Sequence, residues 1–219
     1  MSALAVELAG ERVLLLAHKA LYWPSAKMLL VSDIHFGKAA AFRALGVPVP
    51  RGTTGANLAA LDAVLAEYDV DHIVFLGDFL HARAAHAQAT LAAMAQWRES
   101  HPQLRLTLVR GNHDRHAGDP AARLDIAVVD EPFNVAPFSL CHHPELDEAG
   151  IGYVLAGHVH PVYMLRSGRE AVRLPCFVLG PARAILPSFG AFTGGHAVTP
   201  ARGERIFVVA DEQVFPVEN

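Results

Sequence analysis

The sequence has 219 residues, of which 52% are hydrophobic and only 18% are charged, so a disordered chain is excluded. This length predicts one domain with one main core, covering residues 1–219. The longest apolar runs fall far short of the roughly 18 residues that span a bilayer, and no export signal is visible, so we expect a cytoplasmic protein without a membrane anchor. The formal net charge of −4 argues against a broad basic surface for nucleic acid, although bound divalent cations would concentrate positive charge locally.

Short apolar runs, many of them β-branched, predict buried strands along the whole chain. They cover residues 12–17, 28–32, 72–76, 104–109, 126–129, 138–141, 153–156, 176–179 and 206–210. Residues 54–68 carry an apolar stripe at helical spacing, with Thr53 or Thr54 as the N-cap, and a second helix is expected over 84–98. Prolines make 46–52 a loop. Strand and helix alternate in the first half and strands dominate the second, which indicates an α/β fold with central sheets and outer helices.

The two cysteines, Cys141 and Cys176, show no C-x-x-C spacing and cannot form a disulfide framework. We expect buried thiols in a reducing compartment.

Eight of the 13 histidines lie in five short patches, each directly after a predicted strand. In chain order the patches are Asp33-Ile-His35, Gly77-Asp-Phe-Leu-His81, Gly111-Asn-His-Asp114 with His116, Cys141-His-His-Pro144 and Gly157-His-Val-His160. Open α/β sheets collect ligands beyond the carboxyl ends of their strands, so the five patches are candidates for one shared site. Each patch alone is typical of an ordinary turn, and only the ordered set points to a site.

The polar side chains of these patches are of the types that bind metal ions. The candidates are Asp33, His35, Asp78, Asn112, His142, His158 and His160. Seven ligands exceed one tetrahedral site but suit two adjacent cations that share Asp78 and a water. Such a pair holds a phosphoryl group and activates the bridging water, which indicates phosphoester hydrolysis. Nitrogen and oxygen ligands without thiolate fit Mn²⁺, Fe²⁺ or Zn²⁺.

The succession D-x-H, G-D-x-x-H, G-N-H-D, H-x-P and G-H-x-H, from Asp33 to His160, resembles the calcineurin-like metallophosphoesterase superfamily. The resemblance implies an α/β sandwich of two central mixed β-sheets flanked by helices. It also implies that one metal is held by Asp33, His35, Asp78 and His160, and the second by Asp78, Asn112, His142 and His158. His142 fits the H-x-P pattern better than His143, although His143 stays an alternative.

Two more histidines complete the expected mechanism. His113 follows the ligand Asn112 and suits protonation of the leaving oxygen near neutral pH. His81 lies three residues after Asp78, as in the double-strand-break repair nucleases that the chain resembles, and would orient His113 or contact phosphate; the alternative is an ordinary histidine at a helix start. Asp114 would either orient His113 or cap the following turn.

Segments outside the metal motifs, at 20–24, 37–43, 46–50 and 189–195, resemble the PdeM family of ligase-associated DNA damage response endonucleases. That resemblance implies Mn²⁺-dependent cleavage of single-stranded DNA by a metal-bridging hydroxide, alongside a DNA ligase, an exonuclease and a helicase. One alternative is a small-molecule or nucleotide phosphatase or phosphodiesterase with the same metal site. Another is a binding partner in a repair assembly with a silent metal site. The oligomeric state is left open.

Basic side chains near the patches are candidates for contacting substrate phosphate. Lys38 and Arg115 are the foremost of these, and Arg43, Arg83 and Arg110 are further candidates, although such arginines are commonly solvated or ion-paired. Four aromatic residues could stack on unpaired bases, but core packing is the expected use for most of them. They are Trp23, Phe36, Phe42 and Phe79.

Overall fold

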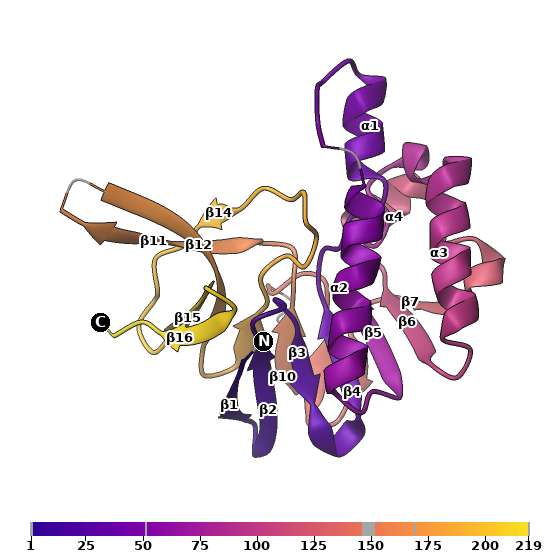
Figure 1. Ribbon diagram of the computed structural model, residues 1–219. Helices are drawn as coiled ribbons and strands as arrows, with labels where there is room; N and C mark the ends of the chain where they lie inside the picture. Colours follow the sequence, from indigo (N-terminus) through magenta and orange to yellow (C-terminus); the bar gives the residue numbers. More distant parts are fainter. Residues whose placement is uncertain (1, 51, 146–151, 169, 219) are drawn as a thin grey trace.

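The computed structural model describes residues 2–50, 52–145, 152–168 and 170–218, and Figure 1 shows its helices gathered beside two β-sheets. The first sheet has the strand order β1-β2-β3-β4-β5-β6-β7. Its strands are Ala3–Leu8 (β1), Glu11–Leu16 (β2), Leu21–Trp23 (β3), Met28–Val31 (β4), His72–Leu76 (β5), Arg105–Val109 (β6) and Ile126–Val129 (β7). Strands β1 to β4 are antiparallel neighbours, whereas β4 to β7 are parallel.

The second sheet has nine strands and the main order β14-β11-β12-β13-β10-β9-β8, with β15 and β16 added beside β12. Its strands are Phe133–Val135 (β8), Phe138–Leu140 (β9), Tyr153–Ala156 (β10), Pro161–Ser167 (β11), Glu170–Leu179 (β12), Arg183–Ile185 (β13), His196–Ala197 (β14), Arg205–Ala210 (β15) and Gln213–Pro216 (β16). Strand β10 runs parallel to both β9 and β13, and the other pairs include antiparallel ones. Both sheets are therefore mixed, which confirms the expected fold class.

The helices all precede the second sheet in the chain. They are the α-helices Lys38–Ala44 (α1), Thr53–Glu67 (α2), Gln88–Ser100 (α3) and Asn112–Ala117 (α4), and the 3₁₀ turns Pro24–Ala26, Arg83–His86 and Ala122–Leu124. Within the described part of the chain, no α-helix covers the outer face of the second sheet, so the flanking helices lie on one side only. None of the described helices is long and apolar enough to cross a membrane.

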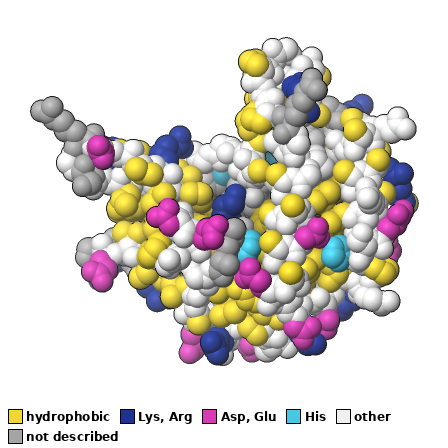
Figure 2. All heavy atoms as spheres, in the orientation of Figure 1, with side chains coloured by type: hydrophobic (Ala, Val, Ile, Leu, Met, Phe, Trp, Pro, Cys, Tyr) yellow, Lys and Arg dark blue, Asp and Glu magenta, His cyan; other side chains and the backbone are white. Residues whose placement is uncertain are grey.

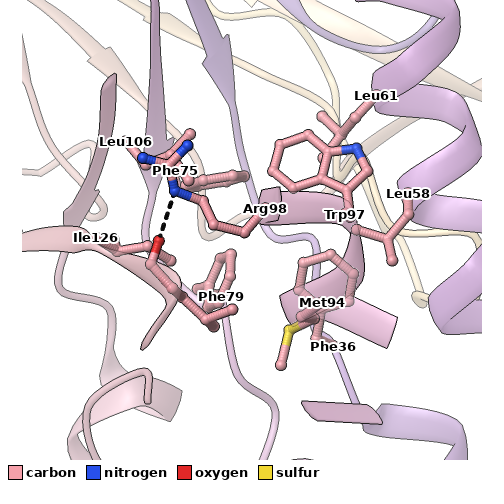
Figure 3. Close-up of a pocket in the computed structure, with 11 residues that line it drawn as sticks. Phe36, Leu58, Leu61, Phe75, Phe79, Met94, Trp97, Arg98, Leu106 and Ile126 are labelled. Carbon is pink, nitrogen blue, oxygen red and sulfur yellow. Dashed lines mark hydrogen bonds between the residues drawn. The ribbon is translucent and has the colours of Figure 1, made fainter. Parts of the chain in front are cut away.

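Alternating residues of the parallel strands build two cores, because successive strand side chains point to opposite faces. In β5, Ile73 and Phe75 join the core beneath α2 and α3, whereas Val74 and Leu76 join the core between the two sheets. Figure 3 shows a void in the first core, lined by apolar side chains of α2, α3 and the sheet. The void measures about 10 Å³ and is too small for a ligand.

Two helix starts differ from the sequence expectation. Helix α2 begins at Thr53 with Gly52 as its N-cap at φ +81°, so neither threonine is the cap. The helix expected over 84–98 is split: the 3₁₀ turn ends at His86, Ala87 is extended at ψ 137°, and α3 begins only at Gln88. Both cysteines are fully buried thiols, as expected.

Candidate metal centre

The strand ends bring the five histidine patches together. Strands β4, β5 and β6 are parallel and are followed by Asp33, Asp78 and Asn112, respectively. Strands β9 and β10 of the second sheet are parallel too, and they are followed by His142 and His158. All seven side chains proposed as ligands lie at this shared edge. Figure 2 shows histidine side chains in a hollow of the surface between the α1 region and the β11–β12 hairpin.

One half of the cluster contains Asp33, His35, Asp78 and His160, whose ligand atoms all lie within 4.8 Å of one another. His160 Nε2 is 3.2 Å from Asp33 Oδ1 and 3.3 Å from His35 Nε2. His35 Nε2 is also 3.7 Å from Asp78 Oδ2. Ligands that bind one ion at about 2.1 Å lie about 3 Å apart, so these separations suit a shared cation.

The other half is centred on His142. Its Nε2 lies 2.9 Å from Asn112 Oδ1, 3.0 Å from His158 Nδ1 and 3.5 Å from Asp78 Oδ1. The two oxygens of Asp78 thus face different halves of the cluster, Oδ2 toward His35 and Oδ1 toward His142. A carboxylate in this position can bridge two cations.

Burial gives the cluster the electrostatics of a cation site. Asp33 and Asp78 are at most 2% exposed, and burial together with the charge of Asp33 raises the pKa of Asp78. Burial also lowers the pKa values of His142 and His158, which keeps these imidazoles neutral and their nitrogen lone pairs available. Among the described residues, Asp33 Oδ1 is buried and accepts no hydrogen bond, and its near neighbour is the imidazole of His160 at 3.2 Å. Two buried carboxylates side by side are stabilised by nearby positive charge, so the residues fit divalent cations.

Five of the seven proposed ligands have backbone φ angles in the left-handed region. The φ values are 51° for Asp33, 50° for His35, 50° for Asp78, 68° for His158 and 49° for His160. A non-glycine residue in this region costs about 1 kcal/mol or more, and such strain gathers at functional sites. Hydrogen bonds hold the conformation: the N–H of His35 donates to the Asp78 carbonyl at 2.9 Å, and that of His158 donates to Asp33 Oδ2 at 2.9 Å.

The glycines of the patches leave room for ligands from other strands. A Cβ on Gly77 would overlap the imidazole of His142, and one on Gly157 would come within 2.6 Å of Asp33 Oδ2. Gly111 lies equally close to the Asp78 carboxylate. These glycines are therefore steric requirements of the cluster.

His113 and His81 lie beside the cluster. His113 Nδ1 donates to the backbone carbonyl of His81 at 2.9 Å, because a carbonyl only accepts, and this leaves Nε2 facing the cluster at 4.0 Å from Asp78 Oδ2. The two rings stack with centroids 4.8 Å apart. Burial and the neighbouring His113 lower the pKa of His81 to about 4, so this imidazole is neutral. Asp114 accepts the N–H groups of Gly111 and Leu80 and thus takes the capping role.

The basic candidates differ in their surroundings. Lys38 is partly buried at the start of α1. Burial lowers its pKa, and attraction to Asp33 and Asp78 offsets only part of this effect. Arg115 is exposed on α4, and its side chain forms no hydrogen bond or ion pair within the described residues. Arg110 forms ion pairs with acidic side chains, at 2.8 Å in the case of Asp119. This confirms the alternative that Arg110 is an ion-paired surface residue.

Three of the four aromatic candidates are core residues. Trp23, Phe36 and Phe79 are at most 5% exposed, which confirms the expected packing use. Phe42 is only partly buried, and its ring lies beside His81 and Phe192 with centroids 6.1 Å and 5.8 Å away.

Sequence reasoning missed Glu131, which follows β7. Its carboxylate accepts the backbone N–H of His142 at 2.8 Å, the N–H of His143 at 2.9 Å and Nδ1–H of His143 at 2.6 Å. Burial opposes ionisation of Glu131, but these hydrogen bonds outweigh it and lower its pKa. Its place after a parallel strand is the signal that could have found it.

The loop after β13, which includes the segment 189–195, also braces the site through contacts that the sequence does not predict. Ser188 Oγ donates to the Asp33 carbonyl at 2.8 Å, and the N–H of Ala191 donates to Asn57 Oδ1 at 2.8 Å. Asn57 Nδ2 in turn donates to the Ile34 carbonyl at 2.9 Å. The backbone of the first patch is therefore held from two sides.

Comparison with known proteins agrees with this arrangement. The sequence profile of the calcineurin-like phosphoesterase family matches residues 26–142. Nuclease MPE from Pseudomonas putida is 49% identical, with 99% of this chain and 100% of that chain covered and a TM-score of 0.87. A protein of unknown function from Aquifex aeolicus, AQ665, is 19% identical over 65% of this chain and 81% of its own, with a TM-score of 0.40. A double mutant of Vps29 from Entamoeba histolytica is 11% identical over 87% of this chain and 96% of its own, with a TM-score of 0.33.

No curated protein matches the chain. The family profile covers more than half of the sequence and includes five of the seven proposed ligands, and the similarity to nuclease MPE extends over nearly all of it. The chain therefore belongs to the calcineurin-like phosphoesterase family and is a metal-dependent hydrolase of phosphoesters.

Proposed function

We propose that this protein is a Mn²⁺-dependent endonuclease that cleaves single-stranded DNA during DNA repair in the cytoplasm. The observation that carries the proposal is the 49% identity to nuclease MPE over 99% of the chain. The cluster of two carboxylates, one amide and four imidazoles supplies the chemistry that such a hydrolase needs.

We assign Asp33, His35, Asp78 and His160 to one divalent cation, and Asp78, Asn112, His142 and His158 to a second. His142 is preferred to His143 because its Nε2 lies among the other ligand atoms, whereas Nδ1 of His143 is bonded to Glu131. Cations bound here would polarise the phosphoryl oxygens and lower the pKa of a bound water. Mixed nitrogen and oxygen ligation without thiolate is compatible with Mn²⁺, while Fe²⁺ and Zn²⁺ are the alternatives that a metal series tests.

The catalytic residues proposed are His113 and His81. His113 bonds through Nδ1 to a carbonyl, and its side chain is 38% exposed, so its Nε2 can deliver a proton to a leaving oxygen at the mouth of the cluster. The stacked ring of His81 fixes the orientation of His113. Lys38 and Arg115 are proposed to contact substrate phosphates, with Lys38 nearer to the carboxylates.

A matrix of metals and substrates tests the function. Purified protein is stripped of metal, then given Mn²⁺, Co²⁺, Ni²⁺ or Zn²⁺ with a single-stranded oligonucleotide, p-nitrophenyl phosphate esters or mononucleotides. We expect Mn²⁺-dependent internal cleavage of the oligonucleotide, abolished in Asp78→Ala and His113→Ala. DNA that stays intact with every metal, while small esters are hydrolysed, would instead establish the small-molecule phosphatase that the net charge of −4 favours.

A DNA ligase, an exonuclease and a helicase are the proposed functional partners, on the basis of the sequence segments shared with ligase-associated endonucleases. If so, adding the protein to these enzymes on damaged DNA should raise the yield of joined strands. If the wild-type protein left the yield of joined strands unchanged, and gave the same yield as Asp78→Ala, these enzymes would not be its functional partners.

A further inference from the structure

A pocket of about 210 Å³ adjoins the metal centre and has no role in the chemistry described above. Its lining includes His160 of the metal centre and Lys19, together with Ser188, Thr193 and the glycines of 190–195. None of the lining residues is acidic. The space is sufficient for a phosphate group with part of its sugar, and it opens beside the cluster where a scissile phosphate would lie.

Lys19 is a partly buried cation with spare hydrogen-bonding capacity. Its Nζ donates to the carbonyl of Phe189 at 2.8 Å and, more weakly, to that of Gly190 at 3.4 Å. An ammonium has three N–H donors, so one is left for a ligand. Within the described residues Lys19 has no ion-pair partner, whereas Lys27 is paired with Asp69 at 2.8 Å. Burial lowers the pKa of Lys19 to about 8, as expected for a cation that lacks a counter-charge.

We propose that this pocket holds a phosphate of the DNA strand adjacent to the phosphate being cleaved, with the Lys19 ammonium as its cationic contact. The inference rests on the proposed nuclease function and extends it, because a DNA strand carries a further phosphate on each side of the one that is cleaved. A p-nitrophenyl ester has a single phosphate, which the metal centre would bind, and so leaves this pocket empty. Lys19 would therefore act on affinity for DNA and leave hydrolysis of small substrates unchanged.

The test compares Lys19→Gln, which keeps a donor but removes the charge, with the control Lys27→Gln, which removes an exposed lysine already paired with Asp69. KM and kcat are measured for a single-stranded oligonucleotide and for bis-p-nitrophenyl phosphate. We expect Lys19→Gln to raise KM for the oligonucleotide about 10-fold, since a charge-assisted hydrogen bond is lost, and to leave both constants for the small diester unchanged. The slope of log affinity for DNA against log salt should fall by about 0.7, the value for one phosphate contact on a single strand.

Three other results are decisive against the inference. An unchanged KM and salt slope for DNA would overturn it while leaving the nuclease function intact. Equal losses on both substrates would assign Lys19 to bracing the loop through its two carbonyl contacts, and Lys19→Met, which removes the donors as well, would then show the larger loss of thermal stability. Wild-type protein that hydrolyses the small diester but no DNA would overturn both the nuclease function and this inference.

Discussion

Substituting Gly77 by alanine should damage the fold and the metal centre together. Gly77 has φ +79°, where an L residue costs about 1 kcal/mol. The added methyl would also overlap the buried imidazole of His142, and overpacking of this kind costs about 1 to 3 kcal/mol. We therefore expect Gly77→Ala to lower the free energy of unfolding by about 2 to 4 kcal/mol, and displacement of His142 to weaken metal binding.

Gly10→Ala is the matched control, because Gly10 has a similar φ of +83° but no atom within 4 Å of an added Cβ. Gly10→Ala should lower the free energy of unfolding only by the cost of the positive φ, about 1 kcal/mol, and should leave the metal affinity unchanged. Urea unfolding of the metal-free proteins, followed by circular dichroism, gives the two stabilities, and calorimetric titration with Mn²⁺ gives the affinities. If the two variants lost the same stability and bound metal equally well, the steric argument for the glycine before Asp78 would be refuted.

Three further changes have defined outcomes. Burial holds the pKa of His72 near 4, below its unfolded value of 6.5. Lowering the pH from 7 to 4 should therefore cost about 3 kcal/mol of stability through His72, because the unfolded state takes up the proton. His72→Gln should lose correspondingly less stability over that range, and a loss identical to that of the wild type would contradict this. Glu131→Gln should weaken metal binding about 10- to 100-fold in titration, because the carboxylate fixes the backbone at His142, and unaltered affinity would contradict that role. Asn57→Leu leaves the buried carbonyl of Ile34 without its partner and should lower the free energy of unfolding by about 1 to 3 kcal/mol, whereas a neutral result in urea would show that this carbonyl finds another donor.

The strands could be predicted from sequence where both faces are buried. The runs 72–76 and 153–156 coincide with β5 and β10, since parallel strands between two layers are continuous apolar stretches. The run 126–129 also coincides with β7, although Ala127 in that strand is exposed. Strands with one solvated face, such as β1 and β11, lack this signal and were missed. The start of α3 was placed wrongly because an alanine-rich segment carries no capping residue, and the break at Ala87 is a backbone choice that composition does not reveal.

The candidate site was predictable to the extent that it depends on strand ends. Parallel strands end at one edge, so residue types that follow each run identify a common site without knowledge of the fold. The residues that brace it obey no such rule. Asn57 is in the middle of α2 and bonds both to Ile34 of the first patch and to Ala191 of the loop after β13, a segment more than 100 residues away.

The same bracing stabilises the strained backbone of the site. Five ligands in the left-handed region cost about 5 kcal/mol together at about 1 kcal/mol each, a large part of the stability of a typical domain. Hydrogen bonds between backbone and ligand loops offset this cost: His158 to Asp33, His113 to Asp78 and Ser188 to Asp33, all at 2.8 to 2.9 Å. In two of them the acceptor is a carboxylate whose other oxygen faces the cluster. Each of the two carboxylates in the cluster is thus oriented by a hydrogen bond from a neighbouring loop.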